Sequence, residues 1–247
     1  MATRTDYIAV FDSGRGGISV LRHLRQQMPG ERYLYFGDSA NAPYGSRSTE
    51  EVRQLTMAAA EKLLAQKPLK ALVLACNTAT AAAVKQLRGA YPDLIVIGIE
   101  PALKVAADHF PGGRIGVMAT EVTLREEKLA HQMERFPQLC IQRIAAPGLV
   151  ERIEAGQTES EETTRFLETL LLPYRGKLDA LVLGCTHYPF VKSTIAQILG
   201  EEVCLLDGGA GTARQTRRCL EEAGLLFDGP GSLTIENSLD ERRMNAL

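Results

Sequence analysis

The chain has 247 residues, of which 45% are hydrophobic and 23% charged, a composition that gives a globular protein enough apolar side chains for a core. Its net charge of −2 provides no basic field that would attract nucleic acid. No apolar run reaches the roughly 20 residues that span a bilayer, and the N-terminus has no signal-peptide pattern. We therefore expect a cytoplasmic protein that binds neither nucleic acid nor a membrane.

The elements that the sequence predicts alternate between short β-rich runs and amphipathic helical stretches. Strands are predicted at residues 7–11, 32–36, 69–75, 94–99, 114–118, 140–144, 180–184 and 203–206, with a short edge strand at 233–236. Helices are predicted at residues 18–28, 50–66, 79–87, 123–136, 160–172, 191–199 and 213–223. Apolar strands separated by helices are typical of βαβ units, and hence of parallel sheets covered by helices on both faces.

The chain contains an internal repeat. Residues 71–78 read ALVLACNT and residues 180–187 read ALVLGCTH, which places two cysteines 109 positions apart. Residues 8–14 (IAVFDSG) match residues 115–121 (IGVMATE) at an offset of 107, and a third pair of strands matches more loosely in the same order. The repeat predicts an α/β fold of two pseudo-symmetric domains with mainly parallel sheets.

The last part of the chain is too short to form a third domain. About 40 residues follow the last strand of the repeat, and they are expected to return to the first domain. We expect the first domain to comprise residues 1–97 plus 208–247, and the second domain residues 98–207. The active site is expected in the cleft between the two domains.

The five cysteines have different surroundings. Their odd number, their wide spacing and the lack of a C-x-x-C pair argue against a disulfide framework and against a zinc site. Cys140 and Cys204 lie in or beside predicted strands and Cys219 lies in a predicted helix, so we expect these three to be core residues. Cys76 and Cys185 differ, because each follows apolar strand residues in matched turns of the repeat.

These two thiols are predicted to lie beyond the carboxyl ends of parallel strands, where open α/β sheets bind ligands. A helix is expected after each turn, and the exposed N–H groups at a helix N-terminus favour a thiolate. Inverting a stereocentre by proton transfer needs a base on one face of the carbon and an acid on the other, and a thiol of pKa about 8.5 can serve as either. One such cysteine alone could be a packed core residue, whereas two in matched turns favour catalysis.

Polar residues near the two turns could assist the thiols. Asp12 could orient the thiol of Cys76 or hold a substrate ammonium group, although acids also follow strands merely to start a turn. His187 could tune Cys185 or bind a carboxylate, or it could only cap or pack the turn. Further donors suited to a carboxylate at a helix N-terminus are Ser13, Asn77, Thr78 and Thr186.

Other signals are weaker. The glycine-rich turn at residues 12–17 departs from the dinucleotide fingerprint G-x-G-x-x-G at Ser19, so a tight turn or a carboxylate site is favoured over a nucleotide site. The loop at residues 41–45 could close over the site or be a surface turn. No lysine has the setting of a pyridoxal Schiff base and no metal-ligand set is evident, so we expect neither a cofactor nor a metal.

Five segments together resemble the glutamate racemase family, within the aspartate/glutamate racemase superfamily. They are DSGRGGISVL (12–21), FGDSANAPYG (36–45), ACNTAT (75–80), ATEVT (119–123) and GCTHYP (184–189). The resemblance covers essentially the whole chain. It implies cofactor-independent racemisation of L- and D-glutamate, with D-glutamate supplied for peptidoglycan, and we expect a homodimer whose partner molecule is the small substrate glutamate.

The resemblance also implies roles for particular residues. Cys76 resembles the base that removes the α-proton from D-glutamate, and Cys185 resembles the base for L-glutamate. Asp12 and His187 resemble the residues that assist the two thiols. The positions that resemble the family's substrate-binding residues are Asp12, Ser13, Pro43, Tyr44, Gly45, Asn77, Thr78, Thr120, Thr123, Thr186 and His187. Two acids, Asp38 and Glu154, match acids that the family keeps near the site.

The sequence departs from the family pattern at two positions and leaves other functions open. Val122 stands where glycine is frequent, and Glu151 stands where proline is common. The alternatives are a racemase of aspartate or another amino acid, a non-catalytic module that holds a small dicarboxylate, and a hydrolase that uses one cysteine as its nucleophile.

Overall fold

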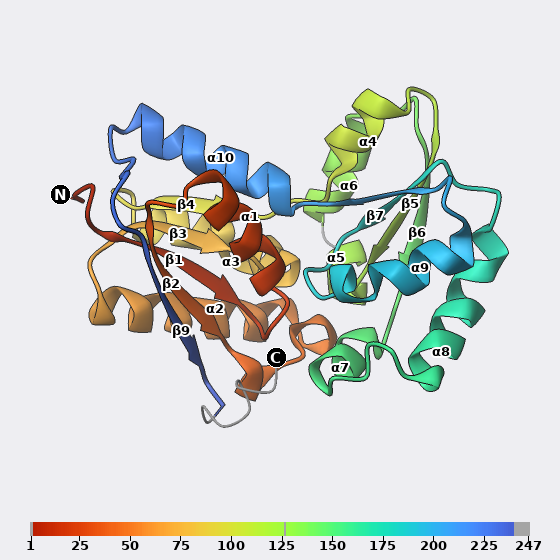
Figure 1. Ribbon diagram of the computed structural model, residues 1–247, viewed down its shortest axis with the longest axis horizontal. Helices are drawn as coiled ribbons and strands as arrows, with labels where there is room; N and C mark the ends of the chain where they lie inside the picture. The colour runs from red at the N-terminus through yellow and green to blue at the C-terminus, as the bar shows by residue number, and fades with distance from the viewer. Residues whose placement is uncertain (1, 126, 240–247) are drawn as a thin grey trace. The chain divides into compact units, whose positions relative to one another are not determined.

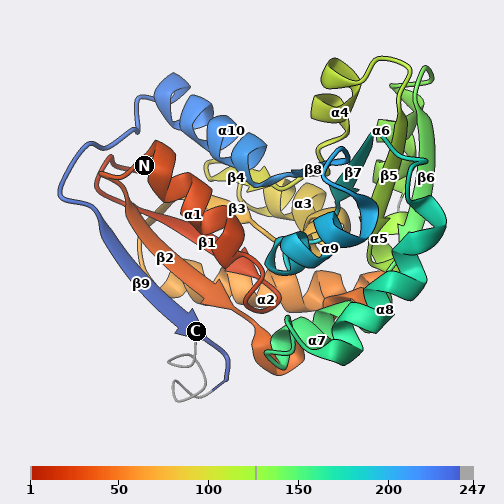
Figure 2. The same cartoon turned by 45° about the vertical axis from the view of Figure 1, so that its right-hand side comes forward.

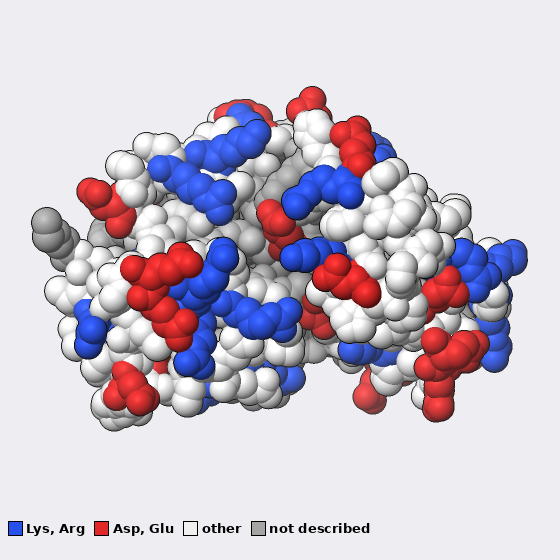
Figure 3. Space-filling view, turned by 90° about the horizontal axis from the view of Figure 1, so that it is seen from above, with Lys and Arg blue, Asp and Glu red and all other residues white. Residues whose placement is uncertain are grey.

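A computed structural model describes residues 2–125 and 127–239 of the chain. The chain forms two compact units, one that runs up to Glu100 and resumes at Gly209, and one that comprises Pro101–Gly208. The sequence predicts two divisions, after residues 97 and 207. On the face shown in Figure 3, basic and acidic side chains are interspersed, so this face carries no field of a single sign. Among the described residues, no helix is both long and apolar enough to cross a membrane.

The first unit is built on a parallel sheet whose described strands number five. They are β1 (Tyr7–Asp12), β2 (Arg32–Gly37), β3 (Leu69–Leu74), β4 (Ile95–Gly98) and β9 (Ser232–Asn237). Their order is β4-β3-β1-β2-β9, and all neighbouring strands run parallel. The edge strand predicted near the C-terminus is confirmed, since β9 pairs with β2 along its whole length (Figure 1).

Helices cover both faces of the first sheet, because successive strand residues point to opposite sides. These helices are α1 (Ile18–Gln27), α2 (Thr49–Gln66), α3 (Asn77–Ala90) and α10 (Gly209–Glu222). Ile8 and Val10 of β1 pack on the side of α1 and α10, whereas Ala9 and Phe11 pack on the side of α2 and α3 (Figures 1 and 2). Strands that are buried on both faces read as continuous apolar runs, which is why the sequence revealed them.

The second unit repeats this plan around a smaller parallel sheet. Its strands are β5 (Arg114–Ala119), β6 (Cys140–Ala145), β7 (Ala180–Leu183) and β8 (Cys204–Asp207). Its helices are α4 (Leu103–His109), α5 (Glu121–Arg125), α6 (Glu127–Glu134), α7 (Leu149–Glu154), α8 (Glu161–Leu171) and α9 (Lys192–Leu199). Apolar residues of α4, α5 and α6 pack on one face of the sheet, and those of α7, α8 and α9 pack on the other.

The two sheets share one topology. The order β4-β3-β1-β2 of the first sheet corresponds to β8-β7-β5-β6 of the second. This agreement confirms the predicted α/β fold with two parallel sheets and the internal repeat. In each sheet the chain winds in opposite directions from a central pair of strands, β1/β3 and β5/β7. Ligands of open α/β sheets bind beyond the carboxyl ends of such switch points.

Several local predictions differ from the structure. The helix predicted at residues 123–136 is observed as α5 and α6, on either side of residue 126, which lies outside the described residues. The short helices α4 and α7 were not predicted, because fewer than two helical turns carry little periodicity. The expectation that Cys140 and Cys204 are core residues is wrong. Both side chains are exposed, because they open β6 and β8, the two edge strands of the second sheet.

The amino ends of β2 and β3 contain a fully buried ion pair. Nζ of Lys70 lies 2.6 Å from Oε2 of Glu31, and neither side chain is exposed to solvent. The same ammonium donates to the carbonyl of Leu225 at 3.0 Å, and Oε1 of Glu31 accepts the N–H of Phe227 at 2.9 Å. Burial lowers the pKa of Lys70, while Glu31 opposes that shift. The pair therefore ties the returning C-terminal segment to the first sheet.

Candidate active site

The first candidate site lies at the carboxyl ends of β1 and β3. Phe11 pairs with Leu74 in register, so Asp12, which ends β1, and Cys76, which follows β3, lie at the same edge of the sheet. A Cβ atom on Gly17 would lie 2.6 Å from Cβ of Asp12. Only glycine therefore lets the start of α1 approach the end of β1 so closely, which accounts for one glycine of the turn at residues 12–17.

The backbone at the start of α3 contacts the Cys76 thiol. Cys76 is the N-cap residue of α3, and its Sγ accepts the N–H of Ala79 at 3.4 Å. Its side chain is buried, with 5% of its surface exposed. The positive end of the α3 dipole and this N–H both favour a thiolate over a thiol. The sequence predicted this placement, and helix α3 begins at Asn77, directly after the cysteine.

Two buried carboxyl groups stand at the same edge. Oδ1 of Asp12 accepts the N–H of Gly14 at 2.9 Å, and the backbone N–H of Asp38 donates to the carbonyl of Asp12 at 2.9 Å. Asp12 is fully buried, and Asp38 is 5% exposed. The structure thus brings Asp38, which only the resemblance had indicated, to the end of the strand that carries Asp12.

The loop after β2 holds Asp38 in place. The hydroxyl of Tyr44 donates to Oδ2 of Asp38 at 2.7 Å, and Nδ2 of Asn41 lies 3.0 Å from both carboxyl oxygens. Burial raises the pKa of Tyr44 far above its ordinary value, and so do the hydrogen bond to Asp38 and the nearby charges. Tyr44 therefore remains a donor. The peptide bond before Pro43 is cis.

The remaining first-unit positions are also buried at this edge. The side chains of Ser13, Asn77 and Thr78 are between 4% and 7% exposed. Oδ1 of Asn77 has no hydrogen-bond partner among the described residues. A buried polar atom without a partner is costly, so this amide is available to a ligand.

The second candidate site lies at the carboxyl ends of β5 and β7. Cys185 follows β7 and is 8% exposed, but it does not cap an α-helix. The short 3₁₀ helix η4 (Tyr188–Val191) comes first, and α9 begins only at Lys192. The helix predicted at residues 191–199 is confirmed, but the 3₁₀ turn separates it from Cys185, so no α-helix N-terminus lies directly beside this thiol as it does at Cys76. Pro189 lies in this turn and has no N–H, so it cannot contribute the bond that would extend α9 towards the cysteine.

Cys76 lies at a helix N-terminus, whereas Cys185 lies beside a histidine that contacts a carboxylate. Nδ1 of His187 lies 3.8 Å from Sγ of Cys185, and Nε2 of His187 lies 2.5 Å from Oε1 of Glu154. The His187 side chain is 2% exposed and that of Glu154 is 16% exposed. With the carboxylate accepting the Nε2 proton, Nδ1 faces the sulfur and can accept the thiol proton. The three side chains form a chain along which Cys185 can be deprotonated.

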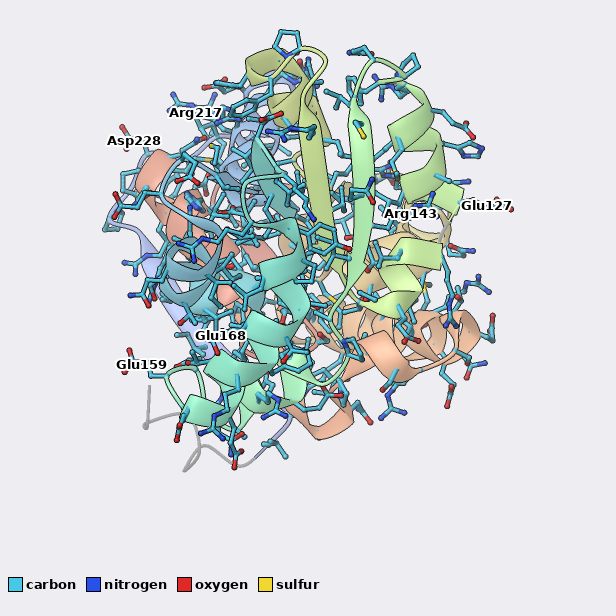
Figure 4. The ribbon with its side chains drawn as sticks, turned by 90° about the vertical axis from the view of Figure 1, so that its right-hand side faces the viewer. Glu127, Arg143, Glu159, Glu168, Arg217 and Asp228 are labelled. Atoms are coloured by element: carbon cyan, nitrogen blue, oxygen red, sulfur yellow. The ribbon has the colours of Figure 1, made fainter. Side chains whose placement is uncertain are left out.

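Two threonines flank the end of β5. The hydroxyl of Thr120 donates to that of Thr123 at 3.0 Å and also accepts the Thr123 N–H at 3.3 Å. Val122, at the position where the family often has glycine, lies within α5 and leaves this contact intact. Arg143 of β6, labelled in Figure 4, donates to the carbonyl of Leu124 in α5. Thr186 is 4% exposed beside Cys185.

Tyr188 is the second buried tyrosine near a cysteine. Its side chain is fully buried, and its hydroxyl has no hydrogen-bond partner among the described residues. Burial raises the pKa of Tyr188 well above its ordinary value, with further contributions from the charges of Cys185 and Glu151. Within the described residues, no group of three His, Cys, Asp or Glu side chains is arranged to hold a metal ion.

Each unit thus assembles its own part of the predicted residue set. The first unit gathers Asp12, Ser13, Tyr44, Cys76, Asn77 and Thr78, with Pro43 and Gly45 in the adjoining loop. The second unit gathers Thr120, Thr123, Cys185, Thr186 and His187. The residue pattern alone did not predict the contacts of Asn41 with Asp38 and of Glu154 with His187. The second of these joins residues 33 positions apart, so no local spacing could reveal it.

Comparisons with known proteins agree with this arrangement. The sequence profile of the family described as Asp/Glu/Hydantoin racemase matches residues 15–216. A glutamate racemase of Clostridium perfringens is 46% identical over 241 residues, which are 96% of this chain and 92% of that protein. The crystal structure of a glutamate racemase isoform from Bacillus anthracis has a TM-score of 0.88 at 34% identity, covering 98% of this chain and 92% of that one. A glutamate racemase from Francisella tularensis in complex with D-glutamate has a TM-score of 0.85 at 27% identity, covering 98% and 92%.

The chain therefore belongs to the Asp/Glu/hydantoin racemase family, and like the other racemases it is an isomerase. Within this family, relatives that are 45–50% identical over most of the chain are glutamate racemases.

Proposed function

We propose that the protein interconverts L- and D-glutamate without a cofactor, by a two-base mechanism that uses Cys76 and Cys185. The observation that carries the proposal is the matched position of the two thiols, each at the switch point of its own sheet. The names of the relatives support glutamate as the substrate, as does the D-glutamate complex of one structural relative. A protein that only binds a dicarboxylate needs no thiol at either position.

The proposed reaction moves one proton off the α-carbon and another onto it. The thiolate of one cysteine takes the α-proton and becomes a thiol, while the electron pair of the broken C–H bond stays on the α-carbon. The thiol of the other cysteine then donates its proton to the opposite face of that carbon and becomes a thiolate. The mechanism therefore requires one sulfur on each face of the substrate and exchanges their roles when the direction reverses.

The surroundings of Cys76 suit the base that removes the proton of D-glutamate. The Ala79 N–H and the N-terminus of α3 stabilise negative charge on its sulfur. Asp12 is a buried carboxylate at the end of the neighbouring strand, suited to hold the substrate ammonium group. The buried donors and acceptors of Ser13, Asn77 and Thr78 would bind the rest of the amino-acid head.

The surroundings of Cys185 suit the base for L-glutamate. His187 can accept the thiol proton at Nδ1, and Glu154 stabilises the imidazolium that results. Thr120, Thr123 and Thr186 provide hydroxyl groups for a substrate carboxylate. The two cysteines are thus activated in different ways, one by a helix and one by a histidine.

The wider role follows from this chemistry. We propose that the enzyme acts in the cytoplasm as a homodimer and supplies D-glutamate for peptidoglycan. The second candidate function is racemisation of aspartate or another amino acid, which the same thiol pair could perform on a different side chain.

The test compares purified wild-type protein with Cys76→Ala and Cys185→Ala, without added cofactor. Optical rotation is followed with L-glutamate, D-glutamate and L-aspartate as separate substrates. We expect wild-type racemisation of glutamate at a rate well above that of aspartate, and no racemisation by either variant. Full activity in either alanine variant would sink the mechanism, and faster turnover of aspartate would overturn the proposed substrate.

A further inference from the structure

The carboxyl group of Asp38 accepts hydrogen bonds from two side chains of its own loop. Its two oxygens face the hydroxyl of Tyr44 at 2.7 Å and the amide nitrogen of Asn41 at 3.0 Å. The backbone N–H of Asp38 donates to the carbonyl of Asp12, which places Asp38 beside the end of β1. Two side chains of the loop after β2 thus orient the carboxyl group of Asp38 beside a second buried carboxyl group, that of Asp12.

Tyr44 joins this carboxylate to the helix that carries the thiol. Its ring is 1% exposed and packs against Phe11 of β1, with ring centroids 6.3 Å apart. It belongs to the same apolar cluster as Cys76 and Ala79. The hydroxyl is thus carried by a ring that is held in place by buried packing in the apolar cluster that also contains Cys76.

In the hydrogen bond between Tyr44 and Asp38, the tyrosine hydroxyl is the donor. The hydroxyl of Tyr44 stays protonated, because burial and the neighbouring negative charge of Asp38 both oppose its ionisation. It can therefore only donate to the carboxyl group of Asp38, and this hydrogen bond fixes the orientation of that group. Besides Asp38, the charges of Cys76 and Asp12 also oppose the ionisation of Tyr44.

We propose that Tyr44 is a positioning residue for proton transfer at Cys76. It acts through Asp38, which it holds as an oriented carboxylate beside Asp12, and its side chain does not itself bind the substrate. This assignment rests on the proposed function and adds a specific role for the tyrosine hydroxyl within it.

The test uses Tyr44→Phe, which removes only the hydroxyl. Its kcat is expected to fall about tenfold, the effect of losing a hydrogen bond to a charged group. Since the racemisation equilibrium constant is 1, kcat/KM must stay equal in the two directions, so the direction shows in isotope effects. With α-deuterated substrates, we expect the isotope effect to rise from D-glutamate, where Cys76 removes the proton, and to fall from L-glutamate.

A double-mutant cycle separates positioning from general stability. In the Asp38→Asn background, the further change Tyr44→Phe is expected to alter kcat by less than about twofold, because its route of action is already lost. Asn41→Ala, a change in a less buried residue, should shift the isotope effects in the same direction. It keeps the proposal testable if Tyr44→Phe folds poorly.

Tyr33→Phe is the matched control. Its buried hydroxyl donates to the carbonyls of Leu24 and Met28 at 3.1 and 3.0 Å, at the opposite end of β2. The Tyr33→Phe variant should be less stable than the wild type and keep the wild-type isotope effects. The assignment is overturned if Tyr44→Phe keeps the wild-type isotope effects, as this control should. It is also overturned if the decrease in kcat caused by Tyr44→Phe adds in full to the decrease caused by Asp38→Asn. Failure of the wild type to racemise glutamate would instead overturn the proposed function.

Discussion

The contact between Glu154 and His187 offers a measurable test of how Cys185 is activated. The change Glu154→Gln keeps the size of the side chain and leaves a neutral oxygen to accept the Nε2 proton of His187. It removes the negative charge that stabilises the imidazolium formed when Cys185 is a thiolate. The distance of 2.5 Å, the burial of His187 and the low exposure of Glu154 mean that solvent does little to replace this charge.

The size of the effect follows from the hydrogen bond that remains. A bond to a charged group contributes about 1.5–3 kcal/mol and a neutral one about 0.5–1.5 kcal/mol, so between the middles of these ranges the variant loses about 1.2 kcal/mol. That difference corresponds to about eightfold in rate. We expect kcat/KM of Glu154→Gln to fall by this factor equally from L- and D-glutamate.

The assay is racemisation followed by optical rotation at saturating and at low substrate concentration. Glu168→Gln is the matched control, because Glu168, labelled in Figure 4, is an exposed acid of α8 in the same unit. It should keep wild-type rates. If Glu154→Gln also stayed within about twofold of the wild type, the carboxylate would have no part in activating Cys185.

Three further predictions concern stability and close packing. Lys70→Met should lower the free energy of unfolding by about 3–5 kcal/mol, because it leaves the buried charge of Glu31 without its partner. Urea denaturation measures this loss, and the loss should be smaller in the double variant that also carries Glu31→Met. Asp179→Asn should lower Tm at neutral pH. Hydrogen bonds from the side chain and backbone of Arg114 hold the pKa of Asp179 below its ordinary value, so their stabilisation exists above about pH 4 and is lost as the pH falls through the lowered pKa; the Tm difference from the wild type should shrink in acid. Gly17→Ala should reduce both Tm and kcat, because the added methyl meets the end of β1 at 2.6 Å, and an unchanged kcat would contradict the close approach.

The sequence predicted the parallel sheets well because their strands are apolar on both faces and recur at a fixed offset. The repeat also indicated the matching positions of Cys76 and Cys185, since each follows the same strand of its unit. The start of α9 was predicted to within one residue, but the different surroundings that the two cysteines receive were not predicted. The sequence around Cys185 reads like that around Cys76, yet Pro189 and the 3₁₀ turn η4 separate this cysteine from α9.

Contacts made by side chains over long separations were beyond prediction from the residue pattern. The interactions of Glu154 with His187 and of Lys70 with Glu31 depend on how helices and loops pack after the sheets form. Hydrophobic periodicity reports which face of an element is buried, but not which polar groups meet there. The resemblance to a family supplied Glu154 as a candidate, and the structure supplied its partner.

The most direct measurement of the two-base mechanism is the early time course of L-glutamate racemisation in D₂O. After a few per cent of turnover, the D-glutamate formed is separated from the remaining L-glutamate, and α-deuterium is measured in each by mass spectrometry. Two bases predict deuterium in nearly all of the D-glutamate and almost none in the remaining L-glutamate, because the incoming proton comes from a second, solvent-exchanged thiol. Early product that keeps its original α-hydrogen, or equal deuterium in both enantiomers, would show that one group both removes and returns the proton, and would contradict the account.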